Sequence, residues 1–211
     1  MIFTDTNILN AIENGTIQIT PFNPTQLGSN SYDLTLASKF MVYKPQKRSV
    51  MQRIRDLVSN SILKPFISKL ADLLLFRDTI ILDSRQKNET QSFVIPETGY
   101  WLMPNTLYLA STNERTYTKD CVGIIEGKSS IARLGMNIHQ TAGYGDVGFN
   151  GTWTLEITVA YPTKVYPNMK IAQISFNSTD STCAVPYGAK KGAKYQNQNT
   201  ATASKNHENF Q

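Results

Sequence analysis

The amino-acid sequence predicts a mainly β protein, a barrel or a sandwich, with one helix near its N-terminus and a helical insert. Three observations support this prediction. Most of the chain consists of short runs in which apolar and polar residues alternate, as in strands with one buried face. Proline and glycine recur between these runs at the short intervals expected of turns. Two longer stretches, residues 5–14 and 48–77, instead repeat their apolar residues at helical spacing.

The N-terminal helix is expected over residues 5–14, where Asp5 or Thr6 can cap its start and Gly15 can end it. The predicted strands lie at residues 16–21, 31–36, 39–43, 79–82, 92–96, 99–103, 107–112, 122–125, 152–159 and 164–176, the last as two strands around a turn. Because these strands are short and closely spaced, we expect them to form a single all-β body.

The insert at about residues 48–77 contains two apolar stripes at helical spacing, separated by Pro65. We expect a helical flap that packs on the β-fold or on a neighbouring subunit. A membrane-surface or partner-binding role is the weaker alternative, because Arg48, Arg53 and Arg55 form only a small basic cluster.

Length and composition exclude several classes of protein. A chain of 211 residues, 40% hydrophobic and 18% charged, favours one globular domain over a disordered chain. The net charge of +5 suits anionic ligands, but no long run of lysine and arginine predicts a nucleic-acid surface. The two cysteines are far apart, and the N-terminus lacks a signal-peptide pattern. No apolar window reaches the length of a membrane span, so we expect a reduced, cytoplasmic protein with no membrane partner.

Residues 128–135 predict a short helix that a glycine ends, and they form a candidate anion site. Ser129 and Arg133 lie four residues apart and therefore share one helix face. Lys128, two hydroxyl groups and the unpaired N–H groups of the helix start would converge on one point. A capped surface helix with a solvated arginine explains the same residues equally well.

Two further features follow this helix. Residues 141–149 place three glycines around Asp146, which suits either close approach to a ligand or a hairpin loop that Asp146 merely caps. Residues 152–159 alternate strictly, so Glu156 stands among threonines on the polar face of a strand. Such a glutamate usually faces solvent, but on the wall of a pocket it becomes a candidate acid–base group.

Three segments, EGKSSIARLG, HQTAGYGDVGFNG and TLE, resemble in order and spacing the dCTP deaminase family of the trimeric dUTPase-like superfamily. SYDLTL near the N-terminus and PYG…KYQNQ near the C-terminus resemble the family as well. The resemblance implies a distorted β-barrel or jelly roll of the dUTPase-like type, a single domain over residues 1–211, and a homotrimer with sites shared between subunits. It also implies that a C-terminal segment, about residues 186–211, closes over bound nucleotide. Gly145 departs from the bulky aliphatic residue usual in the family.

The reaction implied by the resemblance is the hydrolytic deamination of dCTP to dUTP and ammonia. Glu156 matches the catalytic glutamate of the family, which would move protons among the water, the ring nitrogen and the leaving amine. Ser129, Arg133 and the backbone carbonyl near Ala142 would hold the water. A zinc mechanism is not expected, because the two histidines and two cysteines do not form the zinc-deaminase motif. His139 is not expected to be catalytic.

The same resemblance implies a set of nucleotide contacts. Lys128, Ser130, Tyr187 and Lys194 would bind the triphosphate, and Asp146 would accept a hydrogen bond from the deoxyribose 3′-hydroxyl. Mg²⁺ would arrive on the phosphates, mostly through water. The full set of expected substrate-binding residues is Lys128, Ser129, Ser130, Ile131, Ala132, Arg133, Asp146, Thr154, Leu155, Glu156, Gln173, Tyr187, Lys194 and Gln198.

Three alternatives remain open from the sequence. A bifunctional relative would also hydrolyse dUTP to dUMP and pyrophosphate, and Asp146 would then serve both reactions, because the motif aspartate of dUTPases orients a water for attack on phosphorus. A protein that binds dCTP or dUTP- or dTTP-like nucleotides only to sense them, or that binds a partner through the 48–77 insert, would keep the pocket without turnover. A small basic nucleic-acid binder ranks last, because arginine and lysine are not clustered with interleaved aromatic residues.

Overall fold

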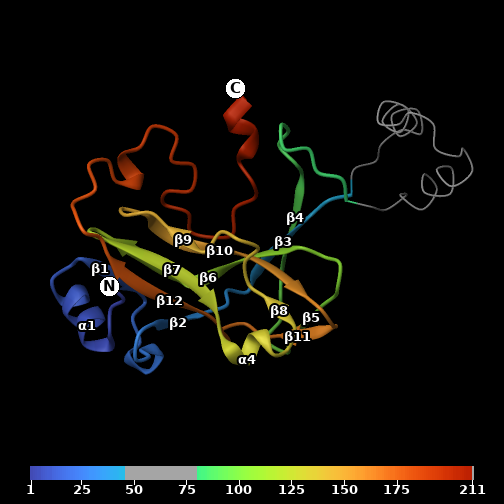
Figure 1. Ribbon diagram of the computed structural model, residues 1–211. Coiled ribbons are helices and arrows are strands. Elements are labelled where there is room, and N and C mark those ends of the chain that lie inside the picture. Colours follow the sequence, from blue (N-terminus) through green and yellow to red (C-terminus); the bar gives the residue numbers. More distant parts are fainter. Residues whose placement is uncertain (46–79, 211) are drawn as a thin grey trace, which may run out of the picture. The chain divides into compact units, whose positions relative to one another are not determined.

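The computed structural model describes residues 1–45 and 80–210 (Figure 1). The helical insert expected at residues 48–77 lies outside the described residues. Contacts divide the chain into two compact units, one of Met1–Val42 with Ser92–Ala203 and one of Tyr43–Gln91 with Ser204–Gln211. The single domain over residues 1–211 stays a prediction. Within residues 1–45 and 80–210, no helix is long and apolar enough to cross a membrane.

The first unit is mainly β, with one helix near its N-terminus (Figure 1). The elements in chain order are α1 (Asp5–Glu13), β1 (Ile17–Thr20), η1 (Pro24–Gln26), β2 (Tyr32–Thr35), β3 (Lys39–Tyr43), β4 (Thr90–Val94), β5 (Tyr100–Leu102), β6 (Tyr108–Thr118), β7 (Cys121–Gly127), α4 (Ser129–Ala132), β8 (Met136–Asn137), β9 (Tyr144–Gly145), β10 (Asn150–Val159), β11 (Thr163–Val165), β12 (Lys170–Ser178), η3 (Tyr187–Ala189) and η4 (Asn206–Phe210). The last of these, η4, belongs to the second unit.

Among the described residues the strands form three sheets. The largest has the order β4-β3-β6-β10-β8, with β1 also paired to β6. A four-stranded sheet has the order β2-β12-β7-β9, and β11 pairs with β5 in a small third sheet. Apolar side chains from the two larger sheets share one core cluster, in which Tyr32 and Phe176 from one sheet and Leu155 and Ile157 from the other are fully buried.

The N-terminal helix forms as expected, but its cap is one residue earlier than predicted. Thr4, rather than Asp5 or Thr6, is the N-cap, because its side chain accepts from the backbone N–H of Asn7 while the Asn7 side chain accepts from the N–H of Thr4. This reciprocal pair is a capping box with asparagine in the place usually taken by glutamate or glutamine. Gly15 follows the helix with a positive φ of 77°.

Two predicted strands differ from those observed. Residues 80–82, the described part of the strand expected at 79–82, are irregular. The strand expected at 107–112 instead continues to Thr118 as β6. It continues because its polar second half is paired on both sides, with β10 on one edge and β1 on the other. Paired backbone groups stabilise that segment although its side chains are mostly polar.

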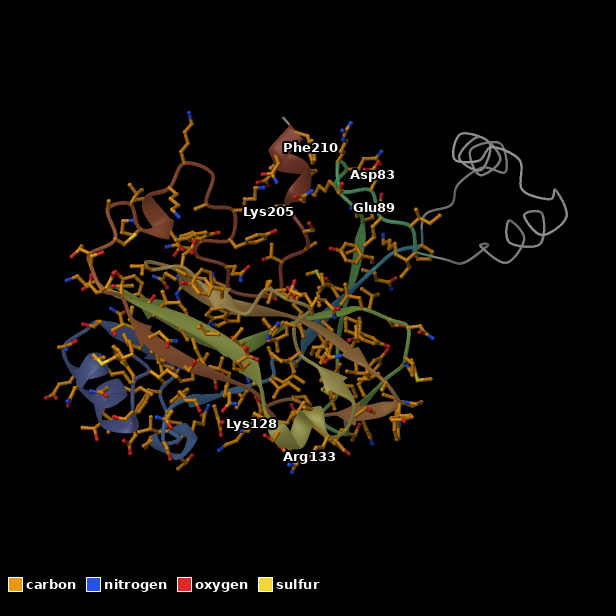
Figure 2. All side chains as sticks on the ribbon, in the orientation of Figure 1. Asp83, Glu89, Lys128, Arg133, Lys205 and Phe210 are labelled. Atoms are coloured by element: carbon orange, nitrogen blue, oxygen red, sulfur yellow. The ribbon has the colours of Figure 1, made fainter. Side chains whose placement is uncertain are left out.

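In the second unit, the described residues are held by a few local contacts (Figure 2). Lys44 Nζ lies 3.6 Å from Glu89 Oε2, and the Asn206 side-chain amide donates to the Ser84 carbonyl at 3.0 Å. The Arg85 guanidinium lies 5.2 Å from the centre of the Phe210 ring. The last two contacts hold the C-terminal η4 against Ser84 and Arg85 of the same unit.

A buried carboxylate connects the two larger sheets. Glu114 on β6 is 2% exposed, yet its oxygens accept from the Thr35 backbone N–H at 2.8 Å, the Thr35 hydroxyl at 2.7 Å and the Gln26 amide at 2.9 Å. A buried carboxylate is tolerated only when its lone pairs are satisfied in this way. Glu114 therefore fixes β2 and η1 against β6.

We expect Glu114→Ala to lower the free energy of unfolding by about 3 kcal/mol, because three donors lose a buried acceptor. Glu114→Gln keeps one acceptor oxygen and should cost roughly half as much. Urea unfolding followed by circular dichroism measures both changes. The control is Glu89→Ala, which removes an exposed ion pair and should cost less than about 1 kcal/mol. Equal stabilities for Glu114→Ala and Glu89→Ala would contradict the role of Glu114.

Candidate active site

Strand β10 carries the candidate acid–base residue. Trp153, Leu155, Ile157 and Val159 are buried, as the alternating sequence predicts, while Glu156 is half-buried on the opposite face. The backbone N–H of Gln140 donates to Glu156 Oε2 at 3.2 Å, and the Gln140 side-chain amide donates to the Glu156 carbonyl oxygen at 3.3 Å. These two contacts fix Glu156 to the segment that follows β8.

The surroundings of Glu156 favour its protonated form. Burial raises the pKa of the Glu156 carboxyl above its ordinary value near 4.5, while the Gln140 N–H and the nearby His139 oppose the rise to a lesser extent. A carboxyl group whose pKa is raised toward neutrality exchanges protons more readily at physiological pH than an exposed one. Glu156 is therefore suited to both accept and donate a proton.

A pocket of about 400 Å³ lies beside this glutamate. It is lined by the end of β7, by α4, by β8 and by the three residues after β8: Glu126, Gly127, Lys128, Ser129, Ala132, Met136, Asn137, Ile138, His139 and Gln140. Gln140 belongs to the pocket wall and also holds the Glu156 carboxylate. The glutamate thus stands next to the pocket wall rather than on an isolated solvent-facing strand.

The predicted helix at residues 128–135 forms as α4, one turn long. Ile131 is 6% exposed and anchors this turn in the core. Gly135 ends it with a φ of 73°, and a Cβ there would lie 2.8 Å from the Ala160 Cβ. Figure 2 shows Lys128 and Arg133 at α4. The Arg133 side chain is exposed and makes no hydrogen bond or ion pair with the residues that the structure describes.

Lys128 is held by Asp33, which is not among the expected site residues. Its ammonium group pairs with Asp33 on β2, and the ammonium group of Lys170 lies 3.0 Å from the other oxygen of the same carboxylate. Asp33 and Gln173 are cross-strand partners, as are Gln173 and Glu126, so the three side chains stand in one row on the sheet face. No local sequence pattern indicates this row, because it depends on strand order.

Gln173 lies in the middle of that row and is fixed at both ends. Its side-chain N–H donates to the Gly127 carbonyl at 3.1 Å, while its amide oxygen accepts from the Ser31 hydroxyl at 3.0 Å. Gln173 thereby holds the backbone at the point where β7 leads into α4. Its contact with the expected site is through Gly127, which lines the pocket.

His139, which was not expected to be catalytic, lies on the pocket wall. Its Nε2 lies 3.7 Å from Glu126 Oε2, and its Nδ1 is buried without a hydrogen-bond partner among the described residues. A Cβ on Gly143 would lie 3.1 Å from His139 Nε2 and would overlap the Ile125 carbonyl oxygen. Glycine is therefore required where this loop passes the histidine.

The rest of the glycine-rich loop also approaches its neighbours closely. Gly145 is buried, and a Cβ there would overlap the indole ring of Trp153. Trp153 therefore occupies the space that the bulky aliphatic residue usual at position 145 would need. Ala142 is exposed, and Asp146 lies 3.8 Å from the ammonium group of Lys190.

The C-terminal segment predicted as a lid lies along β10 up to residue 203, and residues 204–211 belong to the second unit. The Gln198 side chain donates to the Thr152 carbonyl at 2.7 Å, and the Thr154 hydroxyl lies 3.5 Å from its amide oxygen. The Tyr187 hydroxyl accepts from the Tyr195 N–H at 3.1 Å. Lys194, half-buried, lies in the same segment.

The expected site residues thus fall into two groups. One surrounds α4 and the pocket, with Lys128, Ser129, Ser130, Ala132, Arg133 and Gln173. The other lies along β10 and the C-terminal segment, with Asp146, Thr154, Tyr187, Lys194 and Gln198. Glu156 stands on β10 and reaches the pocket through Gln140. Ile131 and Leu155 have buried side chains, so only their main chains can meet a substrate.

The sequence profile of the family described as dCTP deaminase-like matches residues 2–179. The chain belongs to the dCTP deaminase family. Proteins named "dCTP deaminase, dUMP-forming" are similar to it: one from Clostridium botulinum (strain Eklund 17B / Type B) is 37% identical over 92% of this chain and 91% of its own length. Another, from Methanoculleus marisnigri, is 36% identical over 99% of this chain and 97% of its own length.

A solved structure confirms the fold class. The 2′-deoxycytidine 5′-triphosphate deaminase from Agrobacterium tumefaciens is similar with a TM-score of 0.54 and 19% identity over 84% of this chain. This chain spans about half of that longer chain, 48% of its length. The mainly β dCTP deaminase fold with an N-terminal helix is therefore as the sequence predicted.

We expect the free energy of unfolding of the Glu156→Gln variant to exceed that of the wild-type protein by an amount that grows as the pH rises from about 4 to 7. The raised pKa means that the folded protein holds this proton more tightly than the unfolded chain does. The contribution of Glu156 to stability is therefore full below its ordinary pKa and is lost as the pH rises through the raised pKa. Thermal unfolding of both proteins across this range measures the difference, and a constant difference at all pH values would contradict the desolvation of Glu156.

Proposed function

We propose that this protein converts dCTP to dUMP in two hydrolytic steps at one site. The observation that carries the proposal is Glu156, half-buried with a raised pKa and joined through Gln140 to the wall of a pocket that α4 also lines. Membership of the dCTP deaminase family supports the first step. The names of the similar proteins from Clostridium botulinum and Methanoculleus marisnigri favour the dUMP-forming alternative over a deaminase that stops at dUTP.

In the first step, water adds to C4 of the cytosine ring and the C4–N bond then breaks, which releases ammonia. Glu156 takes a proton from the water as the C–O bond forms and delivers it to the ring nitrogen. The glutamate then takes the proton of the hydroxyl group added at C4 and passes it to the leaving amine, which departs as ammonia. A carboxyl group with a raised pKa serves each of these transfers better than one that stays fully ionised.

The water and the developing charge require polar partners. Ser129 and Arg133 are exposed on one side of α4, and their side chains have no partner among the described residues. They are free to hold the water and the tetrahedral adduct, together with the carbonyl near Ala142. Ser130 and the N-terminal N–H groups of α4 supply donors for phosphate oxygens.

In the second step, water attacks the α-phosphorus of dUTP and pyrophosphate leaves. Asp146 is half-exposed and pairs only loosely with Lys190, so its carboxylate can orient that water or the deoxyribose. Mg²⁺ would be held mainly by the phosphates. The Asp33 carboxylate beside Lys128 is already engaged by two ammonium groups, so it is not available as a ligand of the ion. When bound, the ion would neutralise charge on the phosphates.

We further propose a homotrimer in which each site combines two subunits. The two groups of expected site residues support this arrangement, because one surrounds α4 and the other follows β10 and the C-terminal segment. A symmetric ring would bring the first group of one subunit to the second group of the next, so that Glu156 on β10 would act together with Ser129 and Arg133 of the neighbouring subunit. A protein that senses nucleotides without turnover is the competing hypothesis, and the exposed Ser129 and Arg133 on α4 together with Glu156 speak against it.

We expect dCTP and Mg²⁺ to yield dUMP and pyrophosphate without accumulation of dUTP, even in the presence of a zinc-selective chelator. Chromatography of the products measures this outcome. Glu156→Gln should lower kcat at least about 100-fold, because the proton carrier is lost, while nucleotide binding persists. Accumulation of dUTP would limit the function to deamination. Inertness toward both dCTP and dUTP would favour the sensing hypothesis.

Mixed trimers test the shared site. We expect Glu156→Gln and Ser129→Ala to be inactive separately and to regain activity when unfolded and refolded together. Random mixing should place an intact Glu156 opposite an intact Ser129 in about a quarter of the sites. Activity that stays at the sum of the two single variants would contradict a site built from two subunits.

A further inference from the structure

The side chain of Arg115 makes an unusual set of contacts. Its Nε donates to Asn150 Oδ1 at 2.7 Å, its Nη1 to Asn199 Oδ1 at 2.6 Å and its Nη2 to Asn197 Oδ1 at 2.7 Å. All three guanidinium nitrogens therefore donate to side-chain amides. No carboxylate pairs with Arg115 among the described residues. Two of the three acceptors belong to the C-terminal segment, and the third begins β10.

These contacts enclose Gln198, one of the expected substrate-binding residues. Gln198 lies between the two asparagines that Arg115 holds, and its own carbonyl accepts from the Thr152 N–H at 3.0 Å. The Asn197 N–H donates to the Asn150 carbonyl at 2.7 Å, and Asn197 has a positive φ of 61°, a conformation that asparagine tolerates. The main chain around Gln198 is thus fixed on both sides.

The guanidinium is held by a rigid element. Arg115 lies on β6 between two paired neighbours, with Thr20 of β1 opposite on one edge and Thr152 of β10 on the other. Cross-strand partners point to the same face of a sheet, so Arg115 and Thr152 approach the C-terminal segment together. Hydrogen bonds from a charged donor are stronger than neutral ones, and the planar fork sets their directions.

We propose that Arg115 is a positioning residue that seats Gln198, and with it the C-terminal segment, for contact with bound nucleotide. The guanidinium acts on the substrate only through the segment that it holds. This inference rests on the proposed function for its kinetic consequence, whereas the anchoring of the segment is independent of any reaction. The chemistry it requires is an arginine fork opposite three asparagine side chains. Lysine cannot reproduce this pattern, because one ammonium group cannot reach three amides in a plane.

The test compares four variants, and the combination of two of them, with the wild-type protein. Arg115→Met removes the fork and Arg115→Lys keeps the charge. Asn197→Gly with Asn199→Ala removes the two acceptors, permits the positive φ at position 197 and leaves β6 unchanged. Lys119→Met is the matched control, because Lys119 is exposed near the end of β6 and its loss changes the net charge equally. If Arg115→Met fails to fold, the asparagine double variant carries the same test.

The first measurement is trypsin cleavage after the exposed Lys190 and Lys191, without nucleotide. We expect Arg115→Met and the asparagine double variant to be cleaved about ten times faster than wild type, because the segment detaches more often. Arg115→Lys should be intermediate and Lys119→Met unchanged. The combined Arg115→Met and asparagine variant should be cleaved no faster than either alone, since both remove one shared contact.

The second measurement is steady-state kinetics with dCTP. We expect Arg115→Met to raise KM about ten-fold and to change kcat by less than about three-fold, because saturating nucleotide restores the closed segment. Cleavage rates and KM values equal to those of Lys119→Met would overturn the proposal. If the wild-type protein does not turn over dCTP, the proposed function fails, and the cleavage rates without nucleotide still decide whether Arg115 anchors the segment.

Discussion

The pairing of β10 with β6 is the constraint on which both the core and the candidate site depend. Alternation from Trp153 to Val159 in β10 sends Leu155 and Ile157 into the core and Glu156 to the opposite face, whereas Thr152, before a shift in register, is buried although it was expected on the polar face. A slip of one residue would exchange these faces, so burial of the apolar residues also fixes the direction of the glutamate. The position of the candidate acid–base residue is in this sense a consequence of core packing, because Glu156 is carried on a paired strand rather than on a loop.

The same pairing makes the C-terminal segment part of the structure. The segment places its main chain and amide side chains on polar groups of β10 that face away from the core, at Thr152 and Thr154. Arg115 on β6 adds two hydrogen bonds from its guanidinium group to the side chains of Asn197 and Asn199 in this segment. A segment rich in lysine, glycine and asparagine would otherwise fray, and these hydrogen bonds to β10 and β6 hold it in place.

The parts of this arrangement that sequence reasoning could predict are the local ones. Alternation placed Glu156 on the polar face, the glycine at position 135 ended α4, and most strands were found within a few residues. The parts that it missed are long-range: Asp33 with Lys128, Glu114 with Thr35, and Arg115 with two asparagines. Their partners lie tens of residues apart in the chain, and only strand order brings them together.

Gly145 shows how a contact with another part of the chain changes a prediction made from the local sequence alone. Considered alone, a glycine in place of a bulky aliphatic residue predicts a looser loop before Asp146. In the structure this glycine is buried beneath the indole of Trp153, whose ring fills the space and whose N–H donates to Thr116 at 2.9 Å. The volume lost at position 145 is supplied by an aromatic side chain of β10. The loop that carries Asp146 is therefore packed against the same strand that carries Glu156, which couples the positions of the two carboxylates through a single strand.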